Sequence, residues 1–173
     1  MGFFSDLIGY FKNMKKSINY KSMSKEELLK LSDEEFYDAV ECVVNDAVYD
    51  IDHAPTPRPQ RLIYALIRFE AEVNNGGLCQ FFVNSSSECA PYISEAAGLI
   101  GADNVKSLYD DFIRENGINV NDLSSFKLSS AEEFSKQESR YDFDSFDEKF
   151  YADTDFHKKI IDYSRENIDK VIC

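Results

Sequence analysis

The sequence predicts an all-α fold, in which one domain forms a helical bundle of about six to eight helices. Three observations support this prediction. Apolar residues recur at helical spacing along most of the chain, Ser-x-x-Glu sequences of the kind that begin helices recur, and glycine or proline separates the periodic segments. The 173 residues fit one domain, and 14 Phe with 10 Tyr provide enough apolar surface for a core, so wholesale disorder is excluded.

The N-terminal residues 1–23 are expected to form an amphipathic helix ahead of an acidic all-helical domain over residues 24–173. The apolar stripe of this helix consists of Phe3, Phe4, Leu7, Ile8, Phe11, Met14 and Ile18. Such a helix either lies on a membrane surface or docks on the domain's own core or on a second copy. The acidic character of the rest of the chain favours docking, which leaves a homodimer open and predicts no stable membrane insertion.

The clearest helix is expected over residues 33–52. Ser32 and Glu35 match the capping box, in which the serine hydroxyl accepts from a free backbone N–H and the glutamate reaches back to the serine. The same pattern predicts three further helix starts, at Ser24, Ser130 and Ser145. The buried side of helix 33–52 is marked by apolar residues at helical spacing: Phe36, Val40, Val43, Val44, Ala47 and Ile51.

A second long helix is expected after Thr56 and Pro57, since Thr caps helix starts and Pro fits the first helical position. Its apolar stripe ends at Asn74-Asn75-Gly76-Gly77. Because the residues before the glycines keep a helical period, this sequence indicates a break between two helical segments rather than a hairpin. Further helices are expected over residues 91–99, 103–116 and 154–171, with a polar loop over 118–130.

Composition favours a basic protein as the partner. The formal net charge is −13 and the isoelectric point is about 4.5. Nucleic acids and anionic membranes attract Lys and Arg, so direct nucleic-acid binding is not expected. No signal peptide or membrane-spanning apolar run is evident, and the four scattered cysteines are typical of reduced thiols in a cytoplasmic protein. With only two histidines, we expect neither a metal site nor a cofactor.

Acidic residues of helix 33–52 are the candidate contacts for such a partner. The side opposite the valines, with its two flanks, carries Glu34, Asp38, Glu41, Asp46, Asp50 and Asp52. Carboxylates one turn apart are separated by about 5–6 Å, which is of the same scale as the roughly 3.4 Å repeat of phosphates along one DNA strand. The pattern indicates either a surface for a basic, nucleic-acid-binding protein or an acidic face that only keeps the protein soluble.

The chain carries no motif that predicts catalysis. It lacks the Walker and Rossmann phosphate loops, the GxSxG elbow and HExxH, and we expect no enzymatic activity. One polar group stands out against apolar surroundings, and it consists of Glu72, Asn75, Gln80 and Asn84. These side chains either satisfy backbone groups at the glycine break or line a pocket for a small ligand or peptide.

The same segment resembles the signature of the DNA-mimic-protein domain family, a group of small acidic bacterial proteins. The similar residues are Glu72, Asn75-Gly76-Gly77, Gln80 followed by two aromatic residues, and Asn84-Ser85. The resemblance spans roughly residues 32–117 and 145–170, with Leu78 standing where an aromatic residue is usual. It implies an all-helical fold and, for a characterised member, a carboxylate-rich surface that imitates the DNA backbone and occupies a DNA-binding protein such as a repressor.

The leading hypothesis is a non-enzymatic acidic protein that binds a basic protein partner as a DNA mimic. Mimicry depends on where surface charge lies rather than on the core motif, so the hypothesis rests on the acidic residues of helix 33–52. Two alternatives remain: an immunity-type inhibitor of a cationic nuclease, and a small-ligand or peptide-binding module at the Asn-Gly-Gly motif.

Overall fold

The computed structural model describes residues 19–49 and 58–172, and in these residues the fold is all-α. Nine α-helices, seven of them at least seven residues long, form a bundle without strands in the described part of the chain. The predicted fold class is therefore confirmed. The amphipathic helix predicted within residues 1–23 falls mostly outside the described residues, which begin just before the 3₁₀ helix η1 (Tyr20–Ser22).

The helices follow one another along the chain with short connections in most places. After η1 come α2 (Lys25–Leu28), α3 (Asp33–Tyr49), α4 (Arg58–Val83), η2 (Ser85–Tyr92), α5 (Ile93–Leu99), α6 (Asp103–Asn116), η3 (Ser124–Phe126), α7 (Ala131–Glu138), α8 (Phe143–Ala152), α9 (Phe156–Glu166) and α10 (Ile168–Val171).

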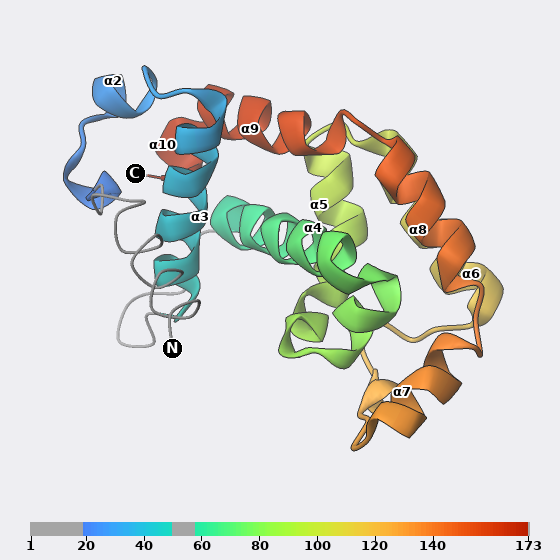
Figure 1. The fold of residues 1–173 in the computed structure, drawn as a ribbon. Coiled ribbons are helices and arrows are strands. Elements are labelled where there is room, and N and C mark those ends of the chain that lie inside the picture. Colours follow the sequence, from blue (N-terminus) through green and yellow to red (C-terminus); the bar gives the residue numbers. More distant parts are fainter. Residues whose placement is uncertain (1–18, 50–57, 173) are drawn as a thin grey trace, which may run out of the picture.

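Helix α4 lies at the centre of the bundle and contacts α3, α5, α8, α9, α10 and η2 (Figure 1). From Leu62 to Ile67 every side chain is buried, as expected for a helix that is covered on all sides. The ring of Phe69 makes edge-to-face contacts, at centroid distances from 5.1 to 6.5 Å, with Phe81, Tyr109, Phe146, Phe150 and Phe156. Such pairs contribute about 0.5–1.5 kcal/mol each beyond the area they bury, so this aromatic cluster ties α4 to α6, α8 and α9.

Three of the four predicted capping sequences lie at helix starts. The reciprocal bonds of a capping box are complete at Ser24, before α2, and at Ser32, before α3. At α7, Ser130 accepts from the Glu133 N–H, but the Glu133 carboxylate accepts from Ser129 instead. These caps satisfy N–H groups that no carbonyl of the same helix can reach.

Two predicted helix boundaries are wrong. α8 begins at Phe143 rather than after Ser145, because Asp142 caps the helix by accepting from the Ser145 N–H at 3.2 Å. The predicted helix over 154–171 is divided at Asn167, whose backbone leaves helical geometry (φ −115°, ψ 30°) between α9 and α10. The Asn167 side chain donates to the Tyr163 carbonyl at 3.0 Å, which satisfies one of the acceptors at the end of α9.

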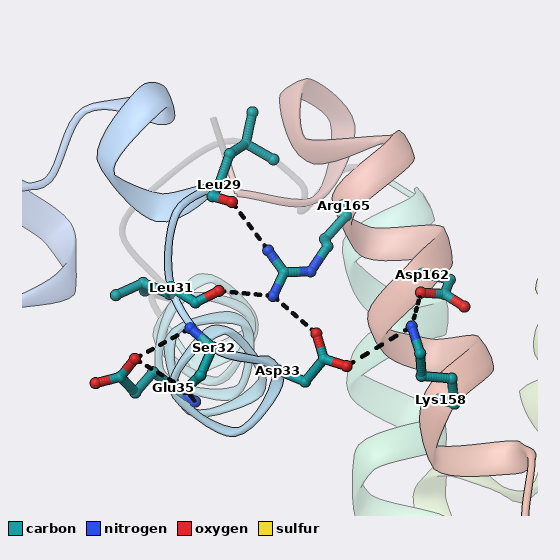
Figure 2. A network of polar contacts seen from close by, with 8 residues as sticks. All are labelled: Leu29, Leu31, Ser32, Asp33, Glu35, Lys158, Asp162 and Arg165. Carbon is teal, nitrogen blue, oxygen red and sulfur yellow. Dashed lines mark hydrogen bonds and ion pairs between the residues drawn. The ribbon is translucent and has the colours of Figure 1, made fainter.

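An Arg165 network holds the start of α3 against α9 (Figure 2). The Arg165 guanidinium donates to the carbonyl oxygens of Leu29 and Leu31 at 3.2 and 2.9 Å. It also donates to Asp33 Oδ1 at 3.0 Å, and Lys158 pairs with the other Asp33 oxygen at 3.7 Å. The negative charge of Asp33 is thus balanced by Arg165 and Lys158.

The same guanidinium lies 4.3 Å from the centroid of the buried Phe36 ring. An arginine over an aromatic face adds a cation–π attraction to the hydrogen bonds. These contacts therefore tie α9 both to the segment before α3 and to the first turn of α3.

Candidate functional site

Three acidic residues follow one another along α3 at intervals of one helical turn. We call Glu34, Asp38 and Glu41 the α3 acidic stripe; Glu34 is exposed, and Asp38 and Glu41 are partly exposed. The opposite side of α3 is buried through Phe36 and other apolar residues, as the sequence predicts. Glu34 and Glu41 make no hydrogen bond or ion pair with any residue that the structure describes, so their negative charge is directed to solvent.

The other predicted contact residues are placed differently. Asp46 is exposed but forms an ion pair with Lys21, next to α3 in η1. Asp50 and Asp52 lie outside the described residues. The acidic residues beside the stripe are also engaged, since Asp33 belongs to the Arg165 network and Glu35 to the capping box. Fewer carboxylates of the described part of α3 are therefore directed to solvent than the number of acidic residues in this segment suggests.

A second group of acidic residues lies far from α3. Glu138 of α7 and Asp144 and Glu148 of α8 are exposed and make no hydrogen bond or ion pair within the described ranges. Figure 1 places α3 and α7 at opposite ends of the molecule. We call these three residues the α7–α8 acidic group, and they allow a charge-matched comparison with the α3 acidic stripe.

The family-like motif forms a hydrogen-bonded cluster around one carboxylate. Glu72 is 9% exposed, and its Oε2 accepts from Gln80 Nε2 and Asn84 Nδ2, both at 2.8 Å. Its Oε1 accepts from the Ser86 hydroxyl at 2.8 Å, and Arg68 lies 3.7 Å away. We call this arrangement the Glu72 clasp. Burial raises the pKa of Glu72, but the three hydrogen bonds and Arg68 outweigh it and hold the pKa below its ordinary value.

The two glycines explain why the clasp can form. Gly76 and Gly77 leave helical geometry (φ −162°, ψ 26° and φ 77°, ψ 177°), which confirms the predicted break in α4. A Cβ on Gly76 would lie 2.1 Å from Gln80 Oε1, so only glycine leaves room for the Gln80 amide to reach Glu72. Asn75 is exposed and does not join the clasp.

Asp147 of α8 contacts the backbone at the glycine break in α4. Its Oδ1 accepts from the Leu78 N–H at 2.9 Å, at the start of the helical turn that follows the glycines. Gly77 has a left-handed φ, and a Cβ there would lie 2.1 Å from Asp147 Oδ2. Burial raises the pKa of Asp147, although its hydrogen bond with Leu78 opposes this effect.

The motif therefore acts as a structural joint in α4. The amides of Gln80 and Asn84 converge, as expected from their spacing, and each donates a hydrogen bond to Glu72. Sequence reasoning missed Ser86 and Asp147. Ser86 lies close to Asn84 in the sequence, whereas Asp147 is separated from Gly77 by 70 positions and no local pattern points to it.

The described residues show neither a metal site nor a helix that could cross a membrane. No group of three or more His, Cys, Asp or Glu side chains in residues 19–49 and 58–172 could hold a metal ion. Over the same ranges, no helix combines the length and apolarity needed to cross a membrane. Cys79 and Cys89 are buried, and burial raises the pKa of each to about 12, so their thiols stay protonated at neutral pH.

Comparison with known proteins connects the motif to a family. Neither curated proteins nor solved structures give a match. The profile of the DMP19-like protein family matches residues 54–167, which include α4 with its glycine break and extend through α9. The matched stretch begins at residue 54, after α3, whereas the resemblance inferred from the sequence begins near residue 32. The match also includes residues 118–144, which that resemblance leaves out. Because the match covers more than half of the chain, the protein belongs to the DMP19-like protein family.

Proposed function

We propose that this protein is a non-enzymatic regulator that binds a basic, nucleic-acid-binding protein through the α3 acidic stripe and occupies its DNA-binding surface as a DNA mimic. The observation that carries the proposal is the lack of any described partner for Glu34 and Glu41 on a helix that the Arg165 network holds in place. Membership of the DMP19-like family supports the same function.

The spacing of the stripe suits a surface that normally binds phosphates. Carboxylates one turn apart on a helix are separated by about 5–6 Å, within reach of neighbouring Lys and Arg side chains on a DNA-binding protein. Like charges at this spacing cost a helix a few tenths of a kcal/mol per pair. The Arg165 network offsets such a cost, because it stabilises the first turn of α3 without neutralising Glu34.

Further acidic residues extend the proposed surface toward the end of α3. Asp46 would exchange its ion pair with Lys21 for one with the partner, and Asp50 and Asp52, outside the described residues, are proposed as further contacts. The family match begins at residue 54, after all six residues. Mimicry in this protein therefore rests on its own surface charges and not on the shared motif.

Two charge-reversal variants test the proposal. The first changes Glu34, Asp38 and Glu41 to Lys, and the second changes Glu138, Asp144 and Glu148 to Lys. Since each change adds two positive charges, both variants carry a formal net charge of −7 in place of −13. Both are used, beside the unchanged protein, to capture partners from lysate of the source cells, and the captured proteins are identified by mass spectrometry.

The proposal predicts that the α3 variant loses a basic DNA-binding protein that the α7–α8 variant still captures. Loss of that protein from both variants to the same extent would show that only net charge matters, and its retention by the α3 variant would contradict the proposal. A captured nuclease in place of a DNA-binding regulator would support an immunity-type inhibitor that uses the same surface.

A further inference from the structure

One residue of the family-like motif takes no part in the Glu72 clasp. Asn75 is exposed, and its side chain makes no hydrogen bond with any residue in the described ranges 19–49 and 58–172. It comes directly before Gly76, which is also exposed and has no side chain to shield its backbone nitrogen. The side chain of Asn75 and the nitrogen of Gly76 are therefore both open to a reaction with each other.

The chemistry of an Asn-Gly pair is attack of the backbone on the side chain. The backbone nitrogen of Gly76 loses its proton to hydroxide and forms a bond with Cγ of Asn75. The bond from Cγ to Nδ2 breaks, Nδ2 leaves as ammonia, and a cyclic imide remains. One water molecule then opens the ring on either side of its nitrogen. Opening at Cγ gives Asp, and opening at the main-chain carbonyl gives isoaspartate, in which the main chain runs through the side-chain carbons.

The glycine break favours closure of this ring. The peptide group after Asn75 must rotate out of helical geometry so that the Gly76 nitrogen faces Cγ. In an unbroken helix this rotation would disturb the turns on both sides of the reacting pair, because helical hydrogen bonds form cooperatively. Here Gly76 (φ −162°, ψ 26°) and Gly77 (φ 77°, ψ 177°) already lie outside helical geometry, so the rotation disturbs only the turn before them.

A second Asn-Gly pair in the chain is restrained and gives an internal control. Asn116 ends α6, and Gly117 follows in left-handed geometry. Asn116 is half-buried, and its Nδ2 donates to the Phe112 carbonyl at 2.9 Å. This hydrogen bond must break before Cγ can turn toward the backbone nitrogen, whereas the Asn75 side chain has no such bond to break.

Isoaspartate at residue 75 would disturb the Glu72 clasp. It adds a methylene group to the main chain directly before Gly76, where the Gln80 side chain lies so close that a Cβ on Gly76 would be 2.1 Å from its Oε1. Displacement of Gly76 therefore moves the amide that donates to Glu72 at 2.8 Å. Conversion of Asn75 to Asp, by contrast, changes only an exposed side chain.

We propose that Asn75 is a site of spontaneous deamidation and that its isoaspartate product loosens the joint in α4. The co-reactant is water, and the nitrogen is released as ammonia. The proposal does not depend on the function proposed for the α3 acidic stripe, because the reacting atoms belong to α4 alone.

Timed incubation of the full chain at pH 8.5, folded or unfolded in guanidinium chloride, tests the reaction. Deamidation at Asn75 and at Asn116 is quantified in digests by mass spectrometry, with isoaspartate and Asp distinguished by fragmentation. For each site the folded rate is divided by the unfolded rate, which removes the effect of neighbouring residues. Since one hydrogen bond restrains Asn116, this ratio should be at least about threefold larger at Asn75. An equal or smaller ratio at Asn75 would overturn the proposed site.

Urea unfolding tests the effect on the joint. The isoaspartate fraction is separated after incubation and should lose about as much stability as Gln80→Ala, which removes the same amide. Incubated Asn75→Gln, whose longer side chain closes the ring poorly, controls for damage elsewhere, and Asn75→Asp supplies the charge with an ordinary main chain. Both variants should retain their stability. An isoaspartate fraction as stable as the unchanged protein, or an equal loss in either variant, would contradict the loosened joint.

Discussion

At the scale of single residues, the Glu72 clasp shows how a recognisable motif can serve the fold. Each glycine has a separate steric reason, since Gly76 leaves room for the Gln80 amide and Gly77 leaves room for the Asp147 carboxylate. The donors that surround Glu72 offset the cost of burying its charge. The motif therefore indicates the break in α4 and gives little information on which molecule the protein surface binds.

A double-mutant cycle tests the relation between Gly76 and Gln80. Gly76→Ala should displace the Gln80 amide from Glu72, and Gln80→Ala removes that amide directly, so each change alone should lower the free energy of unfolding by about 1–3 kcal/mol. Because both changes break the same hydrogen bond, the double variant should lose at least about 1 kcal/mol less than the sum. Denaturant unfolding measures all three variants.

Gly77→Ala is the matched control for this cycle. The added Cβ would clash with Asp147 rather than with Gln80, and residue 77 has a left-handed φ that strains alanine. Gln80→Ala should therefore not reduce the loss of stability caused by Gly77→Ala. Additive effects of Gly76→Ala and Gln80→Ala would show that the Gln80 amide does not occupy the space beside Gly76.

The lowered pKa of Glu72 predicts a pH dependence of stability. Between its folded pKa and its ordinary value, Glu72 binds fewer protons in the folded state than in the unfolded state. Its contribution to stability is therefore present above the ordinary value and is lost as the pH falls toward the folded pKa. Glu72→Gln should lower the free energy of unfolding at pH 7 and reduce its decline on acidification, as measured by urea unfolding from pH 7 to pH 3. An equally steep decline in the variant would contradict the assignment.

At the scale of elements, the Arg165 network connects the fold to the candidate surface. Arg165 reaches two carbonyls before α3, one carboxylate in its first turn and the Phe36 ring. No sequence pattern pairs Arg165 with Asp33, because the two are 132 positions apart and the pairing depends on how α9 packs on α3. The start of α3, by contrast, was predictable from the capping box at Ser32 alone.

Removing the guanidinium tests the role of this network. Arg165→Met keeps much of the side-chain volume but removes the donors, and it should lower the free energy of unfolding by about 1–3 kcal/mol. Amide hydrogen exchange should increase in α2 and in the first turn of α3. Lys158→Met is the control: Lys158 also pairs with Asp33 but is exposed, so its loss should change stability by less than about 0.5 kcal/mol. Equal effects of the two variants would show that the network does not hold α3.

Local sequence patterns predicted the presence of the helices better than the residues at which the helices begin and end. Helical spacing identified α3, α4 and α6, and Gly117, in left-handed geometry, ends α6. The Ser-x-x-Glu pattern at Ser145 was misleading, because Asp142 is also a good cap and a start at Phe143 buries Phe143 together with Phe146. The apolar spacing continues past Asn167 and therefore does not report the end of α9 at that residue.

At the scale of the whole molecule, the net charge of −13 is divided among residues with different roles. Some carboxylates cap helices, others pair with Lys or Arg, and Glu70 and Glu72 are buried as acceptors. Of the described acidic residues, Glu34 and Glu41 of α3 and the α7–α8 acidic group at another end of the molecule make no hydrogen bond or ion pair with described residues. Composition predicted an acidic protein, but only the pairing of individual side chains shows which carboxylates are directed to solvent.

The most direct test of DNA mimicry is competition for the captured partner in purified form. Fluorescence anisotropy follows a labelled duplex that contains the partner's DNA site while this protein, or either triple Lys variant, is added. The account predicts that the unchanged protein and the α7–α8 variant displace the duplex, that the α3 variant requires at least about 100-fold more protein, and that displacement weakens as salt rises. Equal displacement by both variants, or a complex that holds the partner, the duplex and this protein together, would contradict it.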